Sequence, residues 1–563
     1  MNVLEPYLRR TRIAHFSMEI ALAPEMHTYS GGLGILAGDT ARSSADLDLP
    51  IVFVSLVSRA GFVRQEIDAE GGQVTNSDPW RPEAWCQPLG AMIAVEIERR
   101  EVWIRSWLYV LSSPLGHGVP VLLLDTDLGQ NSPQDREITH HLYGGDESYR
   151  LKQEIVLGIG GAAMLKALGF GIRTYHLNEG HAALLTVHLL LQFPRPAEDI
   201  IPGEPLYEHV QVRESCVFTS HTPVEAAFDK FPYPLVQSVL GDYIEIEELK
   251  LLGGPDRLNM TRLALNLSGY VNGVSERHAE TAGQIFPGYH VHAVTNGVHA
   301  PTWTHAGFAR LFSASIPHWA YEPAALVRVE QLPDDAIWGA HQAAKRELVA
   351  LIRDQTQVAM REDLPLIGFA RRMTEYKRPD LLFADIGRLT EIARLRPFQI
   401  VFAGMAHPND EAGRRLISTL NDHIRQLSGA IPMAFLPNYN MRMAANLVAG
   451  VDIWLNTPLP PFEASGTSGM KAAFNGVLNL SVLDGWWIEA HSEGVTGWAI
   501  GSGGGGGGDA DDLYRKLAQV VLPLYYDDKA RWAWMMKQAI SKIGSYFNSQ
   551  RMMRRYASEA YIR

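Results

Sequence analysis

The chain has 563 residues, of which 46% are hydrophobic and 20% are charged, and its formal net charge is −12. This composition is that of a folded globular protein and excludes a disordered chain. The acidic charge argues against a general nucleic-acid partner, because a phosphate backbone is bound by a basic surface. Its two cysteines, Cys86 and Cys216, cannot form a disulfide framework for a chain of this size.

The N-terminal ten residues contain no apolar run, so we expect no signal peptide. The longest apolar stretches, such as residues 182–193, fall short of the roughly 18 residues that a membrane-spanning helix needs. No Cys or His spacing indicates a metal site. We therefore expect a cytoplasmic protein without a membrane segment or a bound metal.

Runs rich in Val, Ile and Leu alternate with helical segments along the chain. In chain order these predicted strands are residues 51–57, 119–124, 174–178, 216–219, 366–369, 398–402 and 451–456. Continuous apolar strands separated by helices indicate parallel sheets that are covered on both faces. Residues 179–181 and 221–223 follow directly after two of these strands. Because ligands bind beyond the carboxyl ends of such strands, we expect residues of both halves to meet in a cleft.

A basic run, residues 371–378, follows the predicted strand 366–369. Its Arg371, Arg372 and Lys377 would supply the local positive charge that a small anionic substrate needs in an acidic protein. A solvated basic surface is the alternative interpretation of the same run.

Residues 463–471 combine a carboxylate, hydroxyl side chains, two glycines and a lysine at the predicted start of a helix. The free backbone N–H groups of a helix start favour an anion. The amine of Lys471 could form a Schiff base with an aldehyde. An ordinary helix start with a solvated lysine fits this segment equally well.

Residues 501–508, with their consecutive glycines, predict a flexible surface loop without a function of its own.

Six segments together resemble motifs of the α-glucan phosphorylase family, which includes the glycogen, maltodextrin and starch phosphorylases. They are residues 16–19, 30–34, 295–297 with Trp303, 371–378, 463–471 and 547–556. The segments follow the family's order and cover nearly the whole chain. The resemblance implies an α/β protein of the GT-B fold, with two Rossmann-like doubly wound parallel-sheet domains facing a central cleft. Residues 1–296 would form the N-terminal domain, residues 297–545 the C-terminal domain, and residues 546–563 a helix crossing back.

The resemblance also implies the reaction. It is retaining phosphorolysis of the non-reducing end of an α-1,4-glucan by inorganic phosphate, which gives α-D-glucose 1-phosphate. Pyridoxal 5′-phosphate would be attached covalently to Lys471, and its phosphate group would exchange a proton with the substrate phosphate. The glucan would be maltodextrin, glycogen or starch. A homodimer is the family norm, and the short N-terminus predicts no phosphorylation switch.

The resemblance implies roles for individual residues of this sequence. The catalytic residues are Arg372 and Lys377, which would contact the substrate phosphate, and His221, whose backbone carbonyl would lie near the glucose. The cofactor residues are Lys471, Thr467, Ser468, Arg371, Trp303 and Tyr439. The substrate residues are Glu463, Ser465, Gly466, Asn296, Leu33, Gly31 and Gly32. Arg371, Met405 and Asn440 depart from the residues common in relatives.

Two other functions compete with this one. A nucleotide-sugar glycosyltransferase with the same two-domain architecture, similar to a glycogen synthase, needs no aldehyde-binding lysine. The second alternative is a glucan-binding protein without catalytic activity. Such a protein would not have to keep Lys471, Arg372, Lys377 and Glu463.

Overall fold

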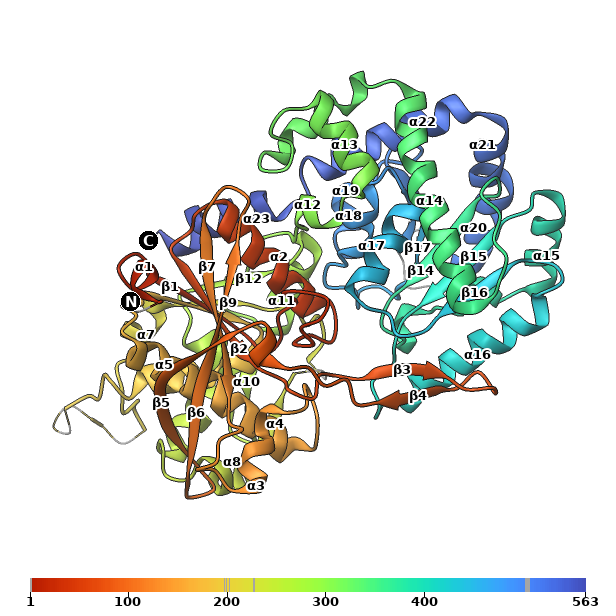
Figure 1. Cartoon of the computed structure of the whole chain (residues 1–563). Coiled ribbons are helices and arrows are strands. Elements are labelled where there is room, and N and C mark those ends of the chain that lie inside the picture. The colour runs from red at the N-terminus through yellow and green to blue at the C-terminus, as the bar shows by residue number, and fades with distance from the viewer. Residues whose placement is uncertain are drawn as a thin grey trace.

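The computed structural model describes residues 3–196, 198, 200–201, 203–225, 228–501 and 507–562. These residues form two α/β halves, each built on one large sheet, and a thin β-hairpin extends from the first half to the second (Figure 1). Residues 502–506 of the predicted glycine-rich loop lie outside the described residues.

The N-terminal half contains a sheet in the order β13-β12-β9-β8-β1-β2-β7-β6-β5. Its strands are β1 (Ile13–Ser17), β2 (Ile51–Leu56), β5 (Gln87–Ile97), β6 (Arg100–Ser112), β7 (Gly118–Asp125), β8 (Thr174–Asn178), β9 (Cys216–Thr219), β12 (Tyr270–Gly273) and β13 (His292–Ala293). Strands β5 and β6 are antiparallel to their neighbours, and the others pair in parallel. After β1, the chain adds β2 and β7 on one side of β1. It then adds β8, β9, β12 and β13 in turn on the other side of β1.

The C-terminal half repeats this winding. Its sheet has the order β16-β15-β14-β17-β18-β19, and all of its strands are parallel. They are β14 (Leu366–Ala370), β15 (Gln399–Ala403), β16 (Met433–Leu436), β17 (Ile453–Asn456), β18 (Leu478–Val482) and β19 (Gly497–Ile500). The winding direction therefore changes between β1 and β8 in one sheet and between β14 and β17 in the other. The prediction of two doubly wound sheets is confirmed, whereas the antiparallel β5–β6 pair was not predicted.

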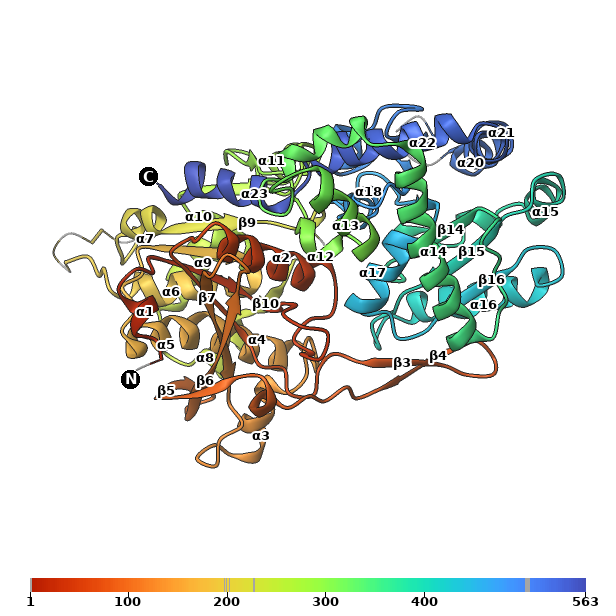
Figure 2. The same cartoon turned by 45° about the horizontal axis from the view of Figure 1, so that its top comes forward.

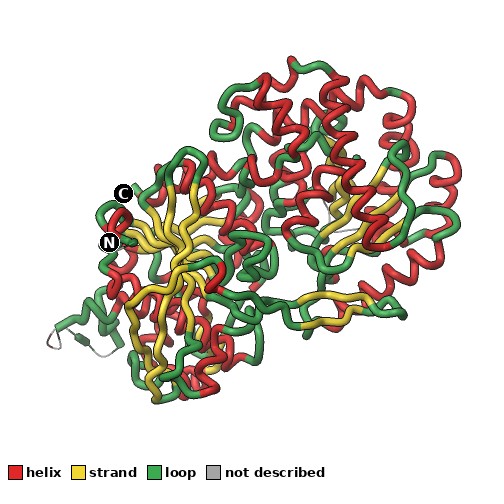
Figure 3. Tube along the Cα trace, in the orientation of Figure 1, coloured by secondary structure: helices red, strands yellow, loops and turns green. Residues whose placement is uncertain are grey.

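Helices lie on both faces of each sheet (Figure 3). In the N-terminal half they are α1 (Glu5–Leu8), α2 (Gly32–Asp46), α3 (Pro133–Arg136), α4 (Glu147–Ile155), α5 (Gly161–Leu168), α6 (Leu184–Leu190), α7 (His209–Ser215), α8 (Tyr233–Leu240), α9 (Ile246–Gly253), α10 (Met260–Asn266) and α11 (Glu276–Ile285). The remaining helices are α12 (Ala300–Trp303), α13 (Ala306–Ser315), α14 (Asp334–Thr356), α15 (Ile386–Leu395), α16 (Glu411–Leu427), α17 (Met441–Gly450), α18 (Ser468–Ala473), α19 (Trp487–Ala490), α20 (Asp509–Lys516), α21 (Leu522–Asp527), α22 (Lys529–Gln538) and α23 (Ser549–Arg555). Every residue of β1, β2, β14 and β15 is buried, as continuous apolar strands require. Within the described part of the chain, every helix is too short or too polar to span a bilayer.

The closing helix α23 packs on the N-terminal half, against α2 (Figure 2). Its Met552 and Met553, together with Tyr556, form a buried apolar cluster with Leu36 and Val217. The division of the chain at residues 296 and 545 stays a prediction, because packing alone sets no boundary.

A buried ion pair holds β14 beside β17, the two strands between which the winding direction of the C-terminal sheet changes. Lys345 of α14 donates to Asp452 over 2.6 Å, and both side chains are fully buried. The same carboxylate accepts the backbone N–H of Leu366, the first residue of β14, and contacts His341 at 2.9 Å. Burial alone would raise the pKa of Asp452, but Lys345 and His341 lower it to about 2.

We predict that Lys345→Met destabilises the protein by about 3–5 kcal/mol, because the substitution leaves a buried carboxylate without its cation. Denaturant unfolding measures this loss. Asp363→Ala is the control, since Asp363 pairs with Arg361 at the surface and its removal should not move the unfolding midpoint. A Lys345→Met protein as stable as the wild type would contradict the prediction.

Candidate active site

In each sheet, polar side chains lie at or just after the ends of the two strands between which the winding direction changes. Glu19 follows β1 and Asn178 ends β8, while Arg371 follows β14 and Asn456 ends β17. Ligands of doubly wound proteins bind at such positions, beyond the carboxyl ends of the strands. The two sheets therefore bring candidate residues from distant parts of the chain to one place.

The centre of the site is a carboxylate bound by two cations. Arg371 donates to Glu463 Oε2 over 2.6 Å, and Lys377 Nζ donates to the same oxygen. All three side chains are at most 11% exposed. Burial would raise the pKa of Glu463, but Arg371 and Lys377 lower it to about 2, so the carboxylate is ionised at neutral pH.

A small cavity opens beside this cluster. Five predicted residues line it, namely Arg371, Glu463, Ser465, Gly466 and Ser468. Five residues that were not predicted line it too, namely Asn456, Pro458, Ser481, Asp484 and Trp486. Among the described residues, Arg371 Nη1, Ser465 Oγ and Asn456 Oδ1 are buried there without a hydrogen-bond partner. Because buried polar atoms are normally paired, these atoms indicate a polar ligand.

Asp484 holds the loop that carries Glu463. One carboxylate oxygen accepts the backbone N–H of Glu463 and the other that of Gly485, each at 2.9 Å. Gly485 has a φ of +53°, and a Cβ there would lie 2.4 Å from the Ser465 carbonyl oxygen, so only glycine fits. Burial, with a contribution from Glu463, raises the pKa of Asp484 to about 6. Its position just after the buried strand β18 was the sequence signal that could have identified it.

The glycine loop of the N-terminal half lies against the basic run. Glu19 Oε2 accepts the backbone N–H groups of Ser30 at 2.6 Å and of Gly31 at 3.1 Å. A Cβ on Gly31 would lie 2.9 Å from the guanidinium of Arg372, so this glycine permits the close approach. Gly32 and Leu33 open helix α2, and a Cβ on Gly32 would meet nothing within 4 Å.

Lys471 is the fourth residue of α18 and is buried. Its Nζ lies 4.0 Å from the centroid of the Trp303 ring, and the indole N–H of Trp303 donates to Asp39 over 2.7 Å. Burial lowers the pKa of Lys471 to about 8, although Asp39 opposes the shift. About one tenth of the amine is therefore neutral at pH 7, and the neutral amine is the form that a nucleophilic lysine requires.

The remaining predicted cofactor residues lie on neighbouring elements. The Thr467 carbonyl accepts the backbone N–H of Lys471 at 3.2 Å, and Ser468 Oγ accepts from the indole of Trp454 at 3.0 Å. Tyr439 lies in the loop after β16. Burial raises the pKa of its hydroxyl group, and the positive charge of Arg371 opposes this shift.

His221 is held in one orientation. Its Nε2 lies 2.6 Å from Asn178 Oδ1, and its backbone N–H donates to Glu179 over 2.8 Å. Burial lowers the pKa of His221 to about 3, so the ring is neutral at physiological pH. Asn296 has a buried Oδ1 without a partner among the described residues.

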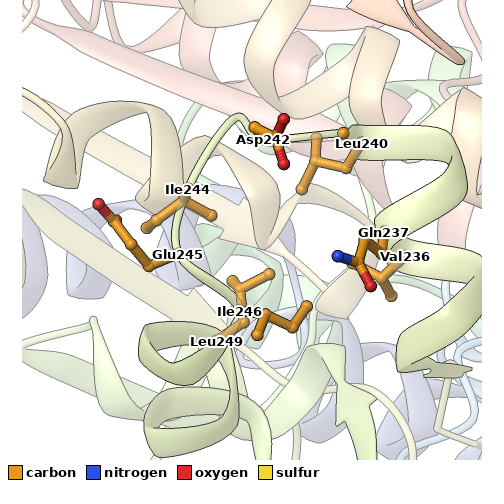
Figure 4. Close-up of a pocket in the computed structure, with 9 residues that line it drawn as sticks. Val236, Gln237, Leu240, Asp242, Ile244, Glu245, Ile246 and Leu249 are labelled. Carbon is orange, nitrogen blue, oxygen red and sulfur yellow. The ribbon is translucent and has the colours of Figure 1, made fainter.

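A separate cavity lies in the N-terminal half between α8 and α9 (Figure 4). Aliphatic side chains line it together with the polar Gln237, Asp242 and Glu245. It contains no predicted site residue, so the chemistry of this protein is assigned to the cluster around Glu463.

Comparison with known proteins agrees with this geometry. A family model described as "Carbohydrate phosphorylase" matches residues 237–497. The maltodextrin phosphorylase of Thermococcus litoralis is 38% identical to this chain, over 98% of the chain and 70% of the relative. The chain belongs to the carbohydrate phosphorylase family.

Other proteins are similar to nearly the whole of this chain. The glycogen phosphorylase of Aquifex aeolicus is 34% identical over 98% of this chain and 86% of the relative. An uncharacterized protein of Methanocaldococcus jannaschii is 30% identical over 97% of this chain and 99% of its own length. The two doubly wound sheets are thus the two halves of the GT-B fold of a carbohydrate phosphorylase.

Proposed function

We propose that this phosphorylase is an α-1,4-glucan phosphorylase that depends on pyridoxal phosphate. It transfers the non-reducing terminal glucosyl unit of the glucan to inorganic phosphate and retains the α configuration. The observation that carries the proposal is the buried Lys471, with its lowered pKa, in the same half of the molecule as the Arg371–Lys377–Glu463 cluster. The printed names of the relatives, maltodextrin phosphorylase and glycogen phosphorylase, support the substrate class.

The residues present fit the proposed cofactor. Lys471 would hold its aldehyde carbon, and the Trp303 ring lies against the lysine amine. The buried Nη1 of Arg371, which has no hydrogen-bond partner within the described part of the chain, offers a positive charge to an anionic group. When bound, pyridoxal phosphate supplies a phosphate group whose second pKa, about 6, suits proton exchange at neutral pH.

The side chains of this protein would orient the reactants and stabilise charge. Glucosyl transfer builds positive charge at C1 of the sugar, which a backbone carbonyl such as that of His221 would stabilise. The His221 ring is neutral and faces Asn178, so it is not available as an acid. Arg372 and Lys377 would bind the phosphate, and Glu463 would accept sugar hydroxyls.

Glu463 would also couple the two substrates. Without ligands, its single carboxylate offsets part of the positive charge of Lys377 and Arg371, which an incoming phosphate needs. A glucan whose hydroxyls engage Glu463 would leave those cations free. Glucan binding would therefore strengthen phosphate binding.

The decisive test of the function is an assay with maltoheptaose and inorganic phosphate, with and without added pyridoxal phosphate. We expect release of glucose 1-phosphate and its loss in Lys471→Ala. Lys529→Ala is the matched control, since the pKa of Lys529 is also lowered to about 8 but this lysine lies in α22, outside the site. Turnover only with a nucleotide sugar would support the glycosyltransferase, and glucan binding without turnover would support the silent binding protein.

The amine of Lys471 should react with pyridoxal phosphate in a pH-dependent manner. Only the neutral amine attacks an aldehyde, and the pKa of Lys471 is lowered to about 8. In protein stripped of cofactor, the initial rate of adduct formation should therefore rise with pH and reach half its maximum near pH 8. Borohydride trapping at each pH, followed by peptide mapping, measures the rate at Lys471. A midpoint above pH 10 would show a solvated lysine instead.

Glu463→Gln should have opposite effects on the two substrates. Removal of the carboxylate frees Lys377 and Arg371, so phosphate should bind the glucan-free protein about tenfold more tightly. The KM for glucan should rise, because an accepting carboxylate is lost. Titration calorimetry with phosphate and steady-state kinetics with maltoheptaose measure the two effects. Glu411→Gln, at an exposed carboxylate of α16, is the control, and unchanged phosphate affinity in Glu463→Gln would refute the coupling.

The family resemblance supports two further proposals, a homodimer and a cytoplasmic location. Light scattering on the purified protein tests the first, and cell fractionation tests the second.

A further inference from the structure

We propose that the β3–β4 hairpin of the N-terminal half positions the phosphate-binding loop of the C-terminal half. Two glutamines of this hairpin, Gln65 and Gln73, are inferred to act as positioning residues for Arg371 and Arg372. The inference rests on the proposed function, because it assumes that this loop binds phosphate.

The hairpin lies apart from the large sheet of its own half. Strands β3 (Arg64–Ile67) and β4 (Gln73–Asn76) form a separate two-stranded sheet and extend beside α16 of the other half (Figures 1 and 2). At the tip, the Gly71 carbonyl accepts from Asn421 at 3.0 Å, and the Glu70 carbonyl accepts from Arg425 at 2.8 Å. Both donors belong to α16, so the hairpin is fixed at its far end.

The glutamine amides bind the backbone of the loop that follows β15. Gln73 donates to the Ala406 carbonyl over 2.9 Å and accepts the Ala406 N–H at 3.0 Å, as a neighbouring strand would. Gln65 donates to the Gly404 carbonyl over 2.9 Å and to Gln73 Oε1 over 2.8 Å. Gln65 is 1% exposed and Gln73 is 4% exposed, so water does not compete for these bonds.

Gln65 reaches a second loop as well. Its Oε1 accepts the backbone N–H of Asn438 at 2.9 Å, just before Tyr439 in the loop after β16. The two glutamines thus hold the carboxyl-end loops of two adjacent strands in the C-terminal sheet.

The loop after β15 is packed directly against the arginine loop. Arg371 N–H donates to the Ala403 carbonyl over 3.1 Å, and Met373 N–H donates to the Met405 carbonyl over 3.0 Å. A Cβ on Gly404 would lie 1.9 Å from the Arg371 carbonyl oxygen, so no space separates the two segments. A displacement of residues 404–406 must therefore displace residues 371–373, which carry both arginines.

Neither glutamine carries charge or belongs to the residues that line the cavity at Glu463. Their effect on phosphate would act through backbone position alone. Because small displacements of a binding group weaken its contacts steeply, loosening this loop should weaken phosphate binding more than glucan binding.

The kinetic test compares Gln73→Ala, Gln65→Ala and the similarly sized Gln73→Met with the wild-type holoenzyme. Gln73→Met nearly keeps the size of the side chain and adds no charge, but it loses the donor to the Ala406 carbonyl. We expect the KM for phosphate to rise about tenfold in each variant, with the KM for maltoheptaose within about twofold. Val74→Ala is the matched control, since this neighbouring residue is 42% exposed, and its constants should not change. An unchanged KM for phosphate in Gln73→Ala would overturn the proposal.

Hydrogen–deuterium exchange tests the mechanical link without the reaction. Amide exchange in residues 371–377 should be faster in Gln73→Ala than in the wild type or in Val74→Ala. If the wild type has no phosphorylase activity, this faster exchange would still support the link while the proposed function fails. Equal exchange in all three proteins would overturn the link. If Gln73→Ala does not fold, Gln73→Asn, which shortens the side chain but keeps its amide, takes its place in both measurements.

Discussion

The charge balance at Glu463 is the interaction on which the site depends. Arg371 and Lys377 lie close together in a largely buried environment, where two like charges repel strongly unless an anion lies between them. The Glu463 carboxylate provides that anion, and Asp484 fixes the loop that presents it. An anionic substrate enters a site whose positive charge is already partly compensated, so the partners of Glu463 are expected to change when ligands bind.

The way the two sheets are wound explains how such a site can form. In each sheet the chain starts near the middle, moves outward in one direction, and then resumes on the other side of the first strand. The strand ends at the change of direction diverge and leave room for ligands. Glu19 and the Gly31 backbone come from this position in the first sheet, and Arg372 comes from the same position in the second. Glycine at position 31 lets the backbone of one half approach the guanidinium of the other without displacing the Arg372 side chain.

The sequence predicted the features that are encoded locally. Buried strands such as β8 and β9 have the predicted bounds, while β15 begins at Gln399 and β17 at Ile453, one and two residues later than expected. Ser465, Gly466 and Ser468, which line the cavity at Glu463, were predicted as site residues through motif resemblance. Asp484 was missed although its position just after β18 was a usable signal. Gln73 was missed because its importance lies in contacts with distant backbone, which no short pattern records. Asp39 was missed for the same reason, since its partner Trp303 lies far along the chain.

The closing helix α23 has a consequence for how the chain folds during synthesis. Tyr556 and Tyr561 hydrogen-bond Thr219 and His176 inside the first half, and Met552 and Met553 complete its apolar packing. The main core of the N-terminal half contains no residue of this segment, but the smaller cluster around Leu36 cannot close until residues 552–561 have left the ribosome. Until then a hydrophobic surface around Leu36 and Val217 stays open, and it is the surface that a chaperone would have to protect.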